Sequence, residues 1–394
     1  MRQTPYLRTR AAAAQIVGNV LREQQSFELS FANNVDISLL NTRDRAFVYN
    51  IVLSTLRRLG QIDQLIDSCL KRPLPHNAFP VRNILRIGVC QIFFLNIAAH
   101  AAVSTCVELT RQQGHSAHIK LVNAVLRRLT REGLSLIANQ DETFLNTPNW
   151  LWQSWSNAYG ENECRQIAYA HLKDVNLDVS LADDPATWAS VLNGIILPSG
   201  TVRLPCSGQV ADLPGYNEGK WWVQDLAARL VAGLAGKFSG KSIIDLCAAP
   251  GGKTAFFAAG GGKLTAVDRS EKRLIRLREN LARLRLNASI IKDDAVYWRP
   301  KQYADIVMLD APCSSTGIVR RHPDILWTKS EPDIKRLVQI QKKLLNAAAE
   351  MVAPGGILIF STCSLQPAES SGHIEPFLST HPDFRIVPVT STDV

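Results

Sequence analysis

Ala-Asp-Ile-Val-Met-Leu-Asp-Ala-Pro-Cys-Ser-Ser-Thr-Gly, at residues 304–317, is the stretch that decides the fold of this chain. Its run at 306–309 is apolar without alternation, which is typical of a strand buried on both faces of a parallel sheet. Pro312 ends the strand, so Asp310 and Cys313 follow at its carboxyl end. Ligands of open α/β sheets bind outside that end of the strands. The stretch therefore predicts a parallel sheet with a site at Asp310 and Cys313.

A second cysteine lies in the same kind of place. The glycines at 355–356 open another apolar strand, and Ser-Thr-Cys-Ser at 361–364 follows it. A cysteine is more often a small buried apolar residue than a nucleophile, and we expect that of most of the eight cysteines. The matched positions at two strand ends single out Cys313 and Cys363 as candidate catalytic thiols.

The region from residue 219 onward alternates strand and helix signals, as a parallel sheet requires. We expect strands at 242–246, 264–268, 289–293, 304–310 and 356–361, a further possible strand at 384–389, and helices most clearly at 271–286 and 331–352.

The first third of the chain is predicted to be all-α, because apolar residues recur at helical spacing with almost no strand signal. One expected helix covers 10–21, and a second runs from a cap at 42–44 to residue 56. The others cover 61–70, 81–96, 103–112 and 118–131. Beyond them, a helix carrying Trp150, Trp152 and Trp155 precedes short strands at 177–181 and 195–197. We therefore predict three domains: a helical bundle at 1–134, a helical linker with a small α+β subdomain at 135–218, and an α/β domain at 219–394.

The net charge of +9 is carried by the first third of the chain. Residues 1–133 hold 17 Lys+Arg against 8 Asp+Glu, while the rest is balanced. A basic module attached to a neutral one suggests that the first binds a polyanion and the second modifies it, although a solvated basic surface is the plainer alternative. The candidate phosphate contacts are Arg8, Arg10, Arg43, Arg45, Arg57, Arg58, Arg127 and Arg128.

Other features of the sequence point to the compartment. No apolar run reaches the ~18 residues of a membrane span, and the first ten residues are too polar for a secretory signal. The cysteines form no C-x-x-C pair, which argues against a structural zinc, and their thin spread fits a reducing environment. We expect a cytoplasmic monomer without a metal or a membrane partner.

The loop at 245–254, Asp-Leu-Cys-Ala-Ala-Pro-Gly-Gly-Lys-Thr, is a candidate cofactor site. Its glycines let backbone approach a ligand at the entrance to a helix, yet the loop matches neither the Walker A nor the G-x-G-x-x-G pattern. The next strand ends at Asp268, where a carboxylate can bind ribose hydroxyls, and the third is followed by Asp294, placed to meet an adenine edge. Acids after successive strands without a phosphate clamp favour S-adenosylmethionine over a dinucleotide.

Five motifs together resemble those of the RNA cytosine-5 methyltransferases. They are the loop at 245–254, Val-Asp-Arg-Ser at 267–270, Asp-Ala-Pro-Cys-Ser at 310–314, Arg-His-Pro-Asp at 321–324 and Ser-Thr-Cys-Ser at 361–364. The first third resembles the NusB-type RNA-binding fold at 43–46 and 121–128. The combination, which spans nearly the whole chain, is similar to the bacterial 16S ribosomal RNA methyltransferases of the Fmu/Sun type.

The resemblance implies a NusB-like bundle, a Rossmann-like methyltransferase sheet, S-adenosylmethionine as cofactor, and 16S rRNA as the partner in rRNA processing. Chemistry alone lets either cysteine attack carbon 6 of a cytosine, which makes carbon 5 nucleophilic. By resemblance, Cys363 is the nucleophile, Cys313 assists product release, and Asp310 and Lys253 complete the catalytic set. The implied cofactor contacts are Cys247, Ala248, Ala249, Pro250, Gly251, Gly252, Lys253, Asp268, Arg273, Asp294 and Asp310, with Arg273 near the carboxylate of the donor.

Three alternatives stay open: a tRNA cytosine-5 methyltransferase, a non-catalytic RNA-binding assembly factor on the same fold, and a DNA cytosine methyltransferase, in which a second Thr-Cys is not expected. The sequence departs from the family at 367–371, where Pro-Ala-Glu-Ser-Ser replaces the usual Asn-Glu pair. The final antiparallel strand of the family is also missing, which predicts a truncated chain or an open sheet edge.

Overall fold

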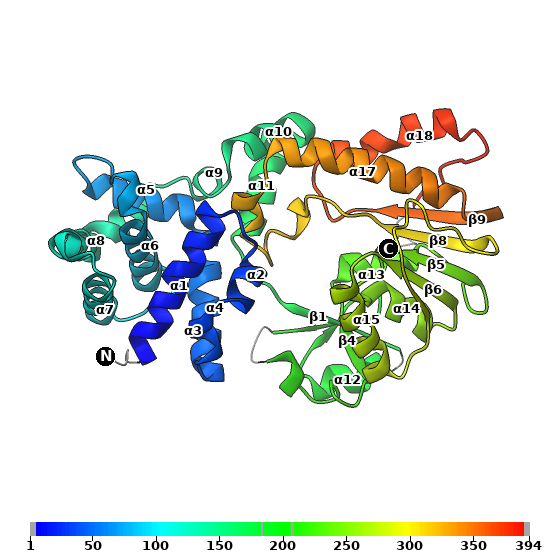
Figure 1. Ribbon diagram of the computed structural model, residues 1–394, viewed down its shortest axis with the longest axis horizontal. Helices are drawn as coiled ribbons and strands as arrows, with labels where there is room; N and C mark the ends of the chain where they lie inside the picture. The colour runs from blue at the N-terminus through cyan, green and yellow to red at the C-terminus, as the bar shows by residue number, and fades with distance from the viewer. Residues whose placement is uncertain (1–4, 183, 206–208, 390–394) are drawn as a thin grey trace. The chain divides into compact units, whose positions relative to one another are not determined.

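The computed structural model describes residues 5–182, 184–205 and 209–389. The chain forms two compact units (Figure 1). The first, which we call the helical unit, comprises Met1–Asp174 and Ser315–Glu331. The second, the sheet unit, comprises Val175–Ser314 and Pro332–Val394. The units meet after Asp174 and at both ends of Ser315–Glu331, whereas the predicted domain boundaries were at 134 and 218.

The helical unit is all-α, as predicted. Its helices are α1 (Pro5–Arg22), α2 (Phe27–Ala32), α3 (Val35–Ser38), α4 (Thr42–Arg57), α5 (Leu59–Cys69), α6 (Phe79–Phe93), α7 (Ala99–Gln112), α8 (Ile119–Ala138), α9 (Glu142–Leu145), α10 (Asn149–Tyr159), α11 (Glu161–His171) and α16 (Ile325–Thr328), with short 3₁₀ turns η1 (His76–Ala78), η2 (Ser116–His118) and η4 (Thr316–Ile318). One apolar core joins α1 and α4–α8. The cap of α4 is Asn41, not residues 42–44, since its side chain accepts the Asp44 N–H at 2.8 Å.

Two features make this unit larger than the predicted bundle. Helices α9–α11 continue it, because α9 packs on α5 and Arg58 pairs with Glu142 at 2.6 Å. The other is Ser315–Glu331, which we call the returning segment. Its Asp324 carboxylate accepts the Phe27 N–H at 3.0 Å, and its Trp327 indole donates to the Leu56 carbonyl at 2.9 Å. A stretch that follows Cys313 in sequence thus packs as part of the helical unit.

The sheet unit is built on five parallel strands: β5 (Ser242–Leu246), β6 (Lys263–Asp268), β7 (Ser289–Lys292), β8 (Ala304–Asp310) and β9 (Val352–Ser361). All five were predicted, and their order is β7-β6-β5-β8-β9. The possible strand at 384–389 was wrong, since these residues form no strand and their apolar side chains Ile386, Val387 and Val389 are exposed. Strand order reverses between β5 and β8, where open α/β sheets bind ligands.

Both faces of this sheet are covered, as the unbroken apolar run at 306–309 predicts. Ile306 and Met308 join a core with α13 (Leu226–Gly233) and α14 (Gly252–Ala259). Val307 and Leu309 join the core beneath α17 (Glu331–Ala349) on the opposite face. Successive residues of a strand point to opposite faces, so one run supplies both cores. Figure 1 shows α17 on one side of the sheet, with α13, α14 and α15 (Glu271–Leu284) on the other.

A small antiparallel sheet precedes the parallel one, in agreement with the predicted α+β subdomain. Its strands are β1 (Leu177–Leu181), β2 (Ile195–Ile196), β3 (Val202–Leu204) and β4 (Trp221–Val223), in the order β2-β3-β1-β4, with α12 (Pro185–Val191) beside them. The last described elements of the unit are two 3₁₀ turns, η5 (Pro367–Glu369) and η6 (Ser371–His373), and α18 (Ile374–Thr380).

Candidate active site

The two candidate thiols lie together at the ends of neighbouring strands. β8 and β9 pair in parallel up to Asp310 opposite Ser361, so both chains leave the sheet at the same edge. The sulfur of Cys313 lies 3.3 Å from the sulfur of Cys363. Cys363 is exposed and Cys313 is half-buried. The structure therefore brings both thiols to one surface that a substrate can reach.

An ion pair lies at the carboxyl end of β8, the strand that Cys313 follows. Lys253, at the start of α14, donates its ammonium to the Asp310 carboxylate at 2.7 Å. Ser361 donates to the other oxygen of the same carboxylate at 3.2 Å. The Lys253 side chain is 13% exposed and that of Asp310 is 39% exposed, so this ion pair opens to solvent mainly on the Asp310 side. The structure thus pairs Lys253 with Asp310 and Cys313 with Cys363, and Asp310 is bonded to Ser361 at the end of the strand that leads to Cys363.

The loop between β5 and α14 has the backbone that its glycines predict. Gly251 has a φ of 104°, in the left-handed region that favours glycine, and it caps the amino end of α14. Cys247 also has a positive φ, of 60°. A Cβ at Gly252 would lie 3.9 Å from the Gln224 Nε2 atom, so the loop and the Gln224 amide share one cradle.

Asp245 lies behind this loop, in β5. It is 0% exposed, and its carboxylate accepts the Thr254 hydroxyl at 2.6 Å. Burial raises the pKa of this carboxyl to about 7, with a hydrogen bond from Thr254 and the charge of Lys253 acting in the opposite direction. Burial likewise raises the pKa of the Cys247 thiol to about 12. Cys247 therefore stays a thiol and supplies the loop with bulk, not with a nucleophile.

Asp268 is the centre of the predicted adenosine pocket. Its carboxylate accepts the Ala249 N–H at 3.2 Å and the Ser270 N–H at 2.9 Å, and the Arg273 guanidinium lies 3.3 Å away. Arg273 also donates to the Ala249 carbonyl. The structure thus ties Asp268 and Arg273 to the cofactor loop. Asp294 lies after β7, where it accepts the Val296 N–H at 3.0 Å.

The residues present fit S-adenosylmethionine. The loop is open at Gly252, where a Cβ would meet no atom closer than the Gln224 Nε2 at 3.9 Å, and among the described contacts this buried Nε2 has no hydrogen-bond partner. A ligand with polar groups and no phosphate suits a loop that carries one lysine, itself paired with Asp310. Asp268 and the loop at 248–252 would hold such a ligand beside the thiols' strand β8.

Some residues around the thiols escaped prediction. Ser314 and Ser364, which follow the two cysteines, and the buried pair Gln341 and Glu369 form a hydrogen-bonded cluster under the site. The signal for two of them was the repeated Cys-Ser dipeptide at 313–314 and 363–364. Gln341 and Glu369 lie on α17 and η5, and their spacing in sequence carried no such signal.

The predicted phosphate contacts of the helical unit differ in exposure and in their bonds within the protein. Arg57 and Arg58 are engaged internally: Arg57 donates to the Arg320 carbonyl at 2.9 Å, and Arg58 pairs with Glu142. Arg8 and Arg10 are half-buried. The exposed members, which remain candidates for phosphate contact, are Arg43, Arg45, Arg127 and Arg128. Two of these also bond within the protein: Arg45 donates to the Ile37 carbonyl at 3.0 Å, and Arg128 pairs with Glu132 at 2.8 Å.

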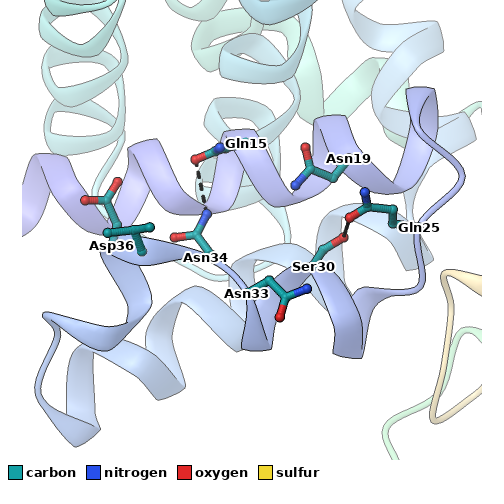
Figure 2. A pocket seen from close by; sticks show the side chains of 8 residues that line it. Gln15, Asn19, Gln25, Ser30, Asn33, Asn34 and Asp36 are labelled. Atoms are coloured by element: carbon teal, nitrogen blue, oxygen red, sulfur yellow. Dashed lines mark hydrogen bonds between the residues drawn. The ribbon is translucent and has the colours of Figure 1, made fainter.

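A polar pocket of the helical unit lies beside α1 (Figure 2). Its lining residues are Gln15, Asn19, Gln25, Ser30, Asn33, Asn34, Val35 and Asp36. Two pairs of them bond to each other: Asn34 donates to Gln15 at 3.1 Å, and Ser30 donates to Gln25 at 3.3 Å. The pocket holds amides and no thiol, so the chemistry predicted from the sequence belongs to the sheet unit.

The part of the chain that the structure describes holds neither a cluster of metal ligands nor a helix that could span a membrane. Across residues 5–182, 184–205 and 209–389, no group of three or more His, Cys, Asp or Glu is placed to hold a metal ion. In the same part of the chain, no helix has the length and apolar character to cross a bilayer.

Comparison with known proteins places this geometry in a family. The family model described as "16S rRNA methyltransferase RsmB/F" matches residues 235–394, and that of the "NusB family" matches residues 7–131. "Ribosomal RNA small subunit methyltransferase B" of Shewanella oneidensis is 34% identical over 392 residues, which cover 96% of this chain and 91% of the relative. The chain belongs to the RsmB/F family of 16S rRNA methyltransferases. The protein of the same name from Vibrio cholerae is 34% identical over 401 residues, covering 97% and 91% of the two chains.

Solved structures agree with the fold of an RsmB/F methyltransferase. The crystal structure of PH0851 superposes with a TM-score of 0.77 at 22% identity and covers 99% of this chain and 93% of that one. NSun6 from Pyrococcus horikoshii with SFG has a TM-score of 0.54 at 18% identity, covering 59% of this chain and 87% of that one. The predicted NusB-like front and Rossmann-like sheet are thereby confirmed. RsmB/F methyltransferases use S-adenosylmethionine, which confirms the predicted cofactor.

Proposed function

We propose that this RsmB/F methyltransferase transfers a methyl group to carbon 5 of a cytosine in 16S ribosomal RNA through a covalent bond to a cysteine. The observation that carries the proposal is the 3.3 Å approach of the Cys313 and Cys363 sulfurs beside the Lys253–Asp310 ion pair. A methyltransferase that acts on an exocyclic nitrogen or a ribose hydroxyl has no use for two thiols. Methylation of an unactivated ring carbon does, because one thiol must add and later leave.

Cys363 is the nucleophile in this proposal, because it is the more exposed of the two thiols. Its sulfur forms a bond to carbon 6, and the electrons of the carbon 5–carbon 6 double bond move toward carbon 5. S-adenosylmethionine, when bound, supplies the electrophilic methyl group that carbon 5 attacks. A base takes the proton from carbon 5, the electrons of that carbon–hydrogen bond restore the ring double bond, and the carbon–sulfur bond breaks as the Cys363 thiolate leaves.

The neighbouring residues have distinct tasks. Asp310, with a proton on its carboxyl group, would donate to ring nitrogen 3, where negative charge develops during attack, and Lys253 holds the Asp310 side chain in place at 2.7 Å. Cys313, within hydrogen-bond reach of the Cys363 sulfur, exchanges a proton there and so assists release of the product. Asp268, the loop at 248–252, Arg273 and Asp294 would hold the methyl donor.

The substrate is proposed to be ribosomal RNA and not tRNA. The helical unit matches the NusB family over residues 7–131, residues 1–133 carry the whole excess of positive charge, and the relatives that match the full chain are named for the small-subunit RNA. A phosphate-rich RNA suits such a surface. A cytosine in a duplex must be extruded at a cost of a few kcal/mol, which favours unpaired or partly assembled rRNA.

Two single substitutions test the covalent step. With a 16S rRNA transcript and S-adenosylmethionine, Cys363→Ala should abolish methyl transfer and form no adduct. Cys313→Ala should accumulate protein on RNA as an adduct that survives denaturing electrophoresis, because attack proceeds and release fails. Cys69→Ala, a half-buried thiol of the helical unit, is the matched control and should methylate normally.

Other outcomes of these experiments would contradict the proposal. An adduct with Cys363→Ala and none with Cys313→Ala would exchange the two roles, and full activity of both variants would exclude the covalent route. Bisulfite sequencing of the product locates the modified cytosine. A tRNA transcript assayed in parallel should give no methylation, and tRNA as the preferred substrate would contradict the rRNA assignment. Failure to bind S-adenosylmethionine in calorimetry would favour a non-catalytic assembly factor.

A further inference from the structure

The loops that carry the two thiols leave strands that stop pairing just before them. β8 and β9 pair up to Asp310 opposite Ser361, and the Ala311 N–H donates to the Ser361 carbonyl at 2.9 Å. Cys313 and Cys363 lie beyond this last bond, yet their sulfurs are only 3.3 Å apart. The sheet ladder therefore brings the loops to one edge but does not hold the thiols in contact.

The carboxylate of Glu369 joins both loops. It is 0% exposed, and it accepts the Ser314 N–H on Oε1 at 2.9 Å. On Oε2 it accepts the Ser364 hydroxyl at 2.6 Å and also the Ser314 hydroxyl. Ser314 follows Cys313 and Ser364 follows Cys363 in sequence. One side chain is thus bonded to the residue next to each thiol.

Helix α17 supplies the back of this cluster. Gln341 is 0% exposed, and its amide donates to Glu369 Oε1 and to the Pro312 carbonyl, both at 3.0 Å. Its amide oxygen lies 2.9 Å from Nε2 of His373. Because Pro312 precedes Cys313, the loop is held on both sides of that thiol. Figure 1 shows α17 running alongside β8 and β9.

Only a carboxylate meets the demand that this cluster makes. It accepts hydrogen bonds on both oxygens at once, whereas an amide offers one acceptor oxygen and one donor group. Here four donors converge on Glu369: the Ser314 N–H, the hydroxyls of Ser314 and Ser364, and the Gln341 amide. A buried polar group is tolerated when its lone pairs are filled in this way. Glutamine would turn an NH₂ group toward hydroxyls that now donate.

We propose that Glu369 is a positioning residue that holds the Cys313 and Cys363 thiols face to face. The purpose of that geometry rests on the proposed function, but the geometry itself can be measured without RNA or a methyl donor. A displacement of about 1 Å between reacting groups can cost roughly a hundredfold in rate. Replacing the Glu369 carboxylate, whose two oxygens both accept hydrogen bonds, should therefore lower both the rate at which the two thiols crosslink and kcat.

Diamide, a mild thiol oxidant, reports the contact directly. The two thiols lose their protons and pass two electrons to diamide, which is reduced to the hydrazine while the sulfur–sulfur bond forms. In the wild-type protein we expect the Cys313–Cys363 disulfide to form at least about tenfold faster than in Glu369→Gln. Peptide mass mapping detects this crosslink. Glu369→Asp, which keeps two acceptor oxygens, should recover part of the rate. Glu375→Gln, exposed on α18, is the matched control and should crosslink normally.

Turnover gives the second readout. For Glu369→Gln, kcat should fall roughly ten- to a hundredfold while KM for RNA and for S-adenosylmethionine stays unchanged, because neither ligand touches this buried side chain. Should this variant fail to fold, Ser364→Ala removes a single donor from the cluster and is measured in the same two assays. The crosslinking rate and kcat of Ser364→Ala should both fall, but by less than those of Glu369→Gln.

Unchanged crosslinking and unchanged kcat in a folded Glu369→Gln chain would overturn the proposal. Lower resistance to urea with both rates unchanged would also overturn it, since that result describes a purely structural carboxylate. Slower crosslinking in a protein whose wild type methylates no cytosine would support the positioning role and reject the proposed function. The two proposals can therefore fail separately.

Discussion

Two buried cysteines of the helical unit, Cys90 and Cys106, and the two at the sheet edge, Cys313 and Cys363, are the same residue type in different environments. Cys90 and Cys106 are 0% exposed, donate to backbone carbonyls at 3.8 and 3.6 Å, and have thiol pKa values raised to about 12 by burial. Cys363 is exposed and lies 3.3 Å from Cys313. The helix bundle closes around its polar groups, whereas parallel strands end together at an edge that stays open. Topology, more than residue type, decides which thiols can do chemistry.

The largest expected effect is in thiol reactivity. Under native conditions near neutral pH, iodoacetamide should label Cys363 more than about a thousandfold faster than Cys90 or Cys106, because the thiolate reacts and a pKa of about 12 leaves almost none. Mass spectrometry of tryptic peptides over time gives the rates. In urea the three cysteines should be labelled at similar rates. Equal labelling rates in the native protein would contradict the difference in environment between these thiols.

The next effect concerns the stability of the sheet unit. The folded pKa of Asp245 is about 7, against ~3.9 for an unfolded chain, so the folded state binds this proton more tightly. The associated stability is fully present below about pH 4 and is lost as pH rises through about 7. Asp245→Asn, which keeps an oxygen for the Thr254 hydroxyl, should remove that loss.

Urea unfolding measures this difference. Between about pH 4 and pH 8, the unfolding free energy of Asp245→Asn should gain roughly 2 to 4 kcal/mol relative to wild type. Asp383→Asn, at an exposed carboxyl of the same unit, should gain nothing. A difference that does not grow with pH would mean that Asp245 is ionised in the folded chain.

The smallest effect is the mirror image in the helical unit. Burial, aided by the charge of Arg320, lowers the pKa of His171 to about 4, against ~6.5 unfolded. The stability that this neutral ring contributes is present above about pH 6.5 and is lost as pH falls through about 4. His171→Phe keeps an aromatic ring against Trp155, which now lies 5.5 Å from the imidazole centroid, and should remove the loss.

The same urea measurement applies, with the opposite sign. Relative to wild type, His171→Phe should gain about 1 to 3 kcal/mol on going from about pH 8 to pH 4. His76→Phe, exposed in η1, serves as the control. The unfolding free energies of Asp245→Asn and His171→Phe, each relative to wild type, should change with pH in opposite directions. A change in the same direction would contradict the protonation states expected for these two buried groups.

The parallel sheet could be predicted from sequence because its signal is local. An apolar run such as 306–309 must be covered on both faces, and Pro312 marks where it stops. The same reasoning placed Asp310, Cys313 and Cys363 at one edge, which the structure confirms as a location. The roles of the two thiols came from resemblance and stay a prediction.

Features that depend on distant partners could not be predicted. In the returning segment, Asp324 and Trp327 pack against residues 297 and 271 positions earlier, and nothing in the sequence of the segment indicates those partners. Glu369 fell in the stretch at 367–371 that departs from the family pattern, so its sequence context pointed away from a role. Helices α2 and α3 were missed because they are short and are defined by their caps, Ser26 and Asn34.

The returning segment also sets the order in which the protein can be completed during synthesis. A chain grows from its amino end, and domains usually fold as they emerge. Here Ser315–Glu331 is made after strands β5–β8 of the other unit, yet the helical unit needs it to pack Trp327 and to satisfy the Phe27 N–H. The helical unit therefore acquires its last buried partners only after most of the sheet unit has been made.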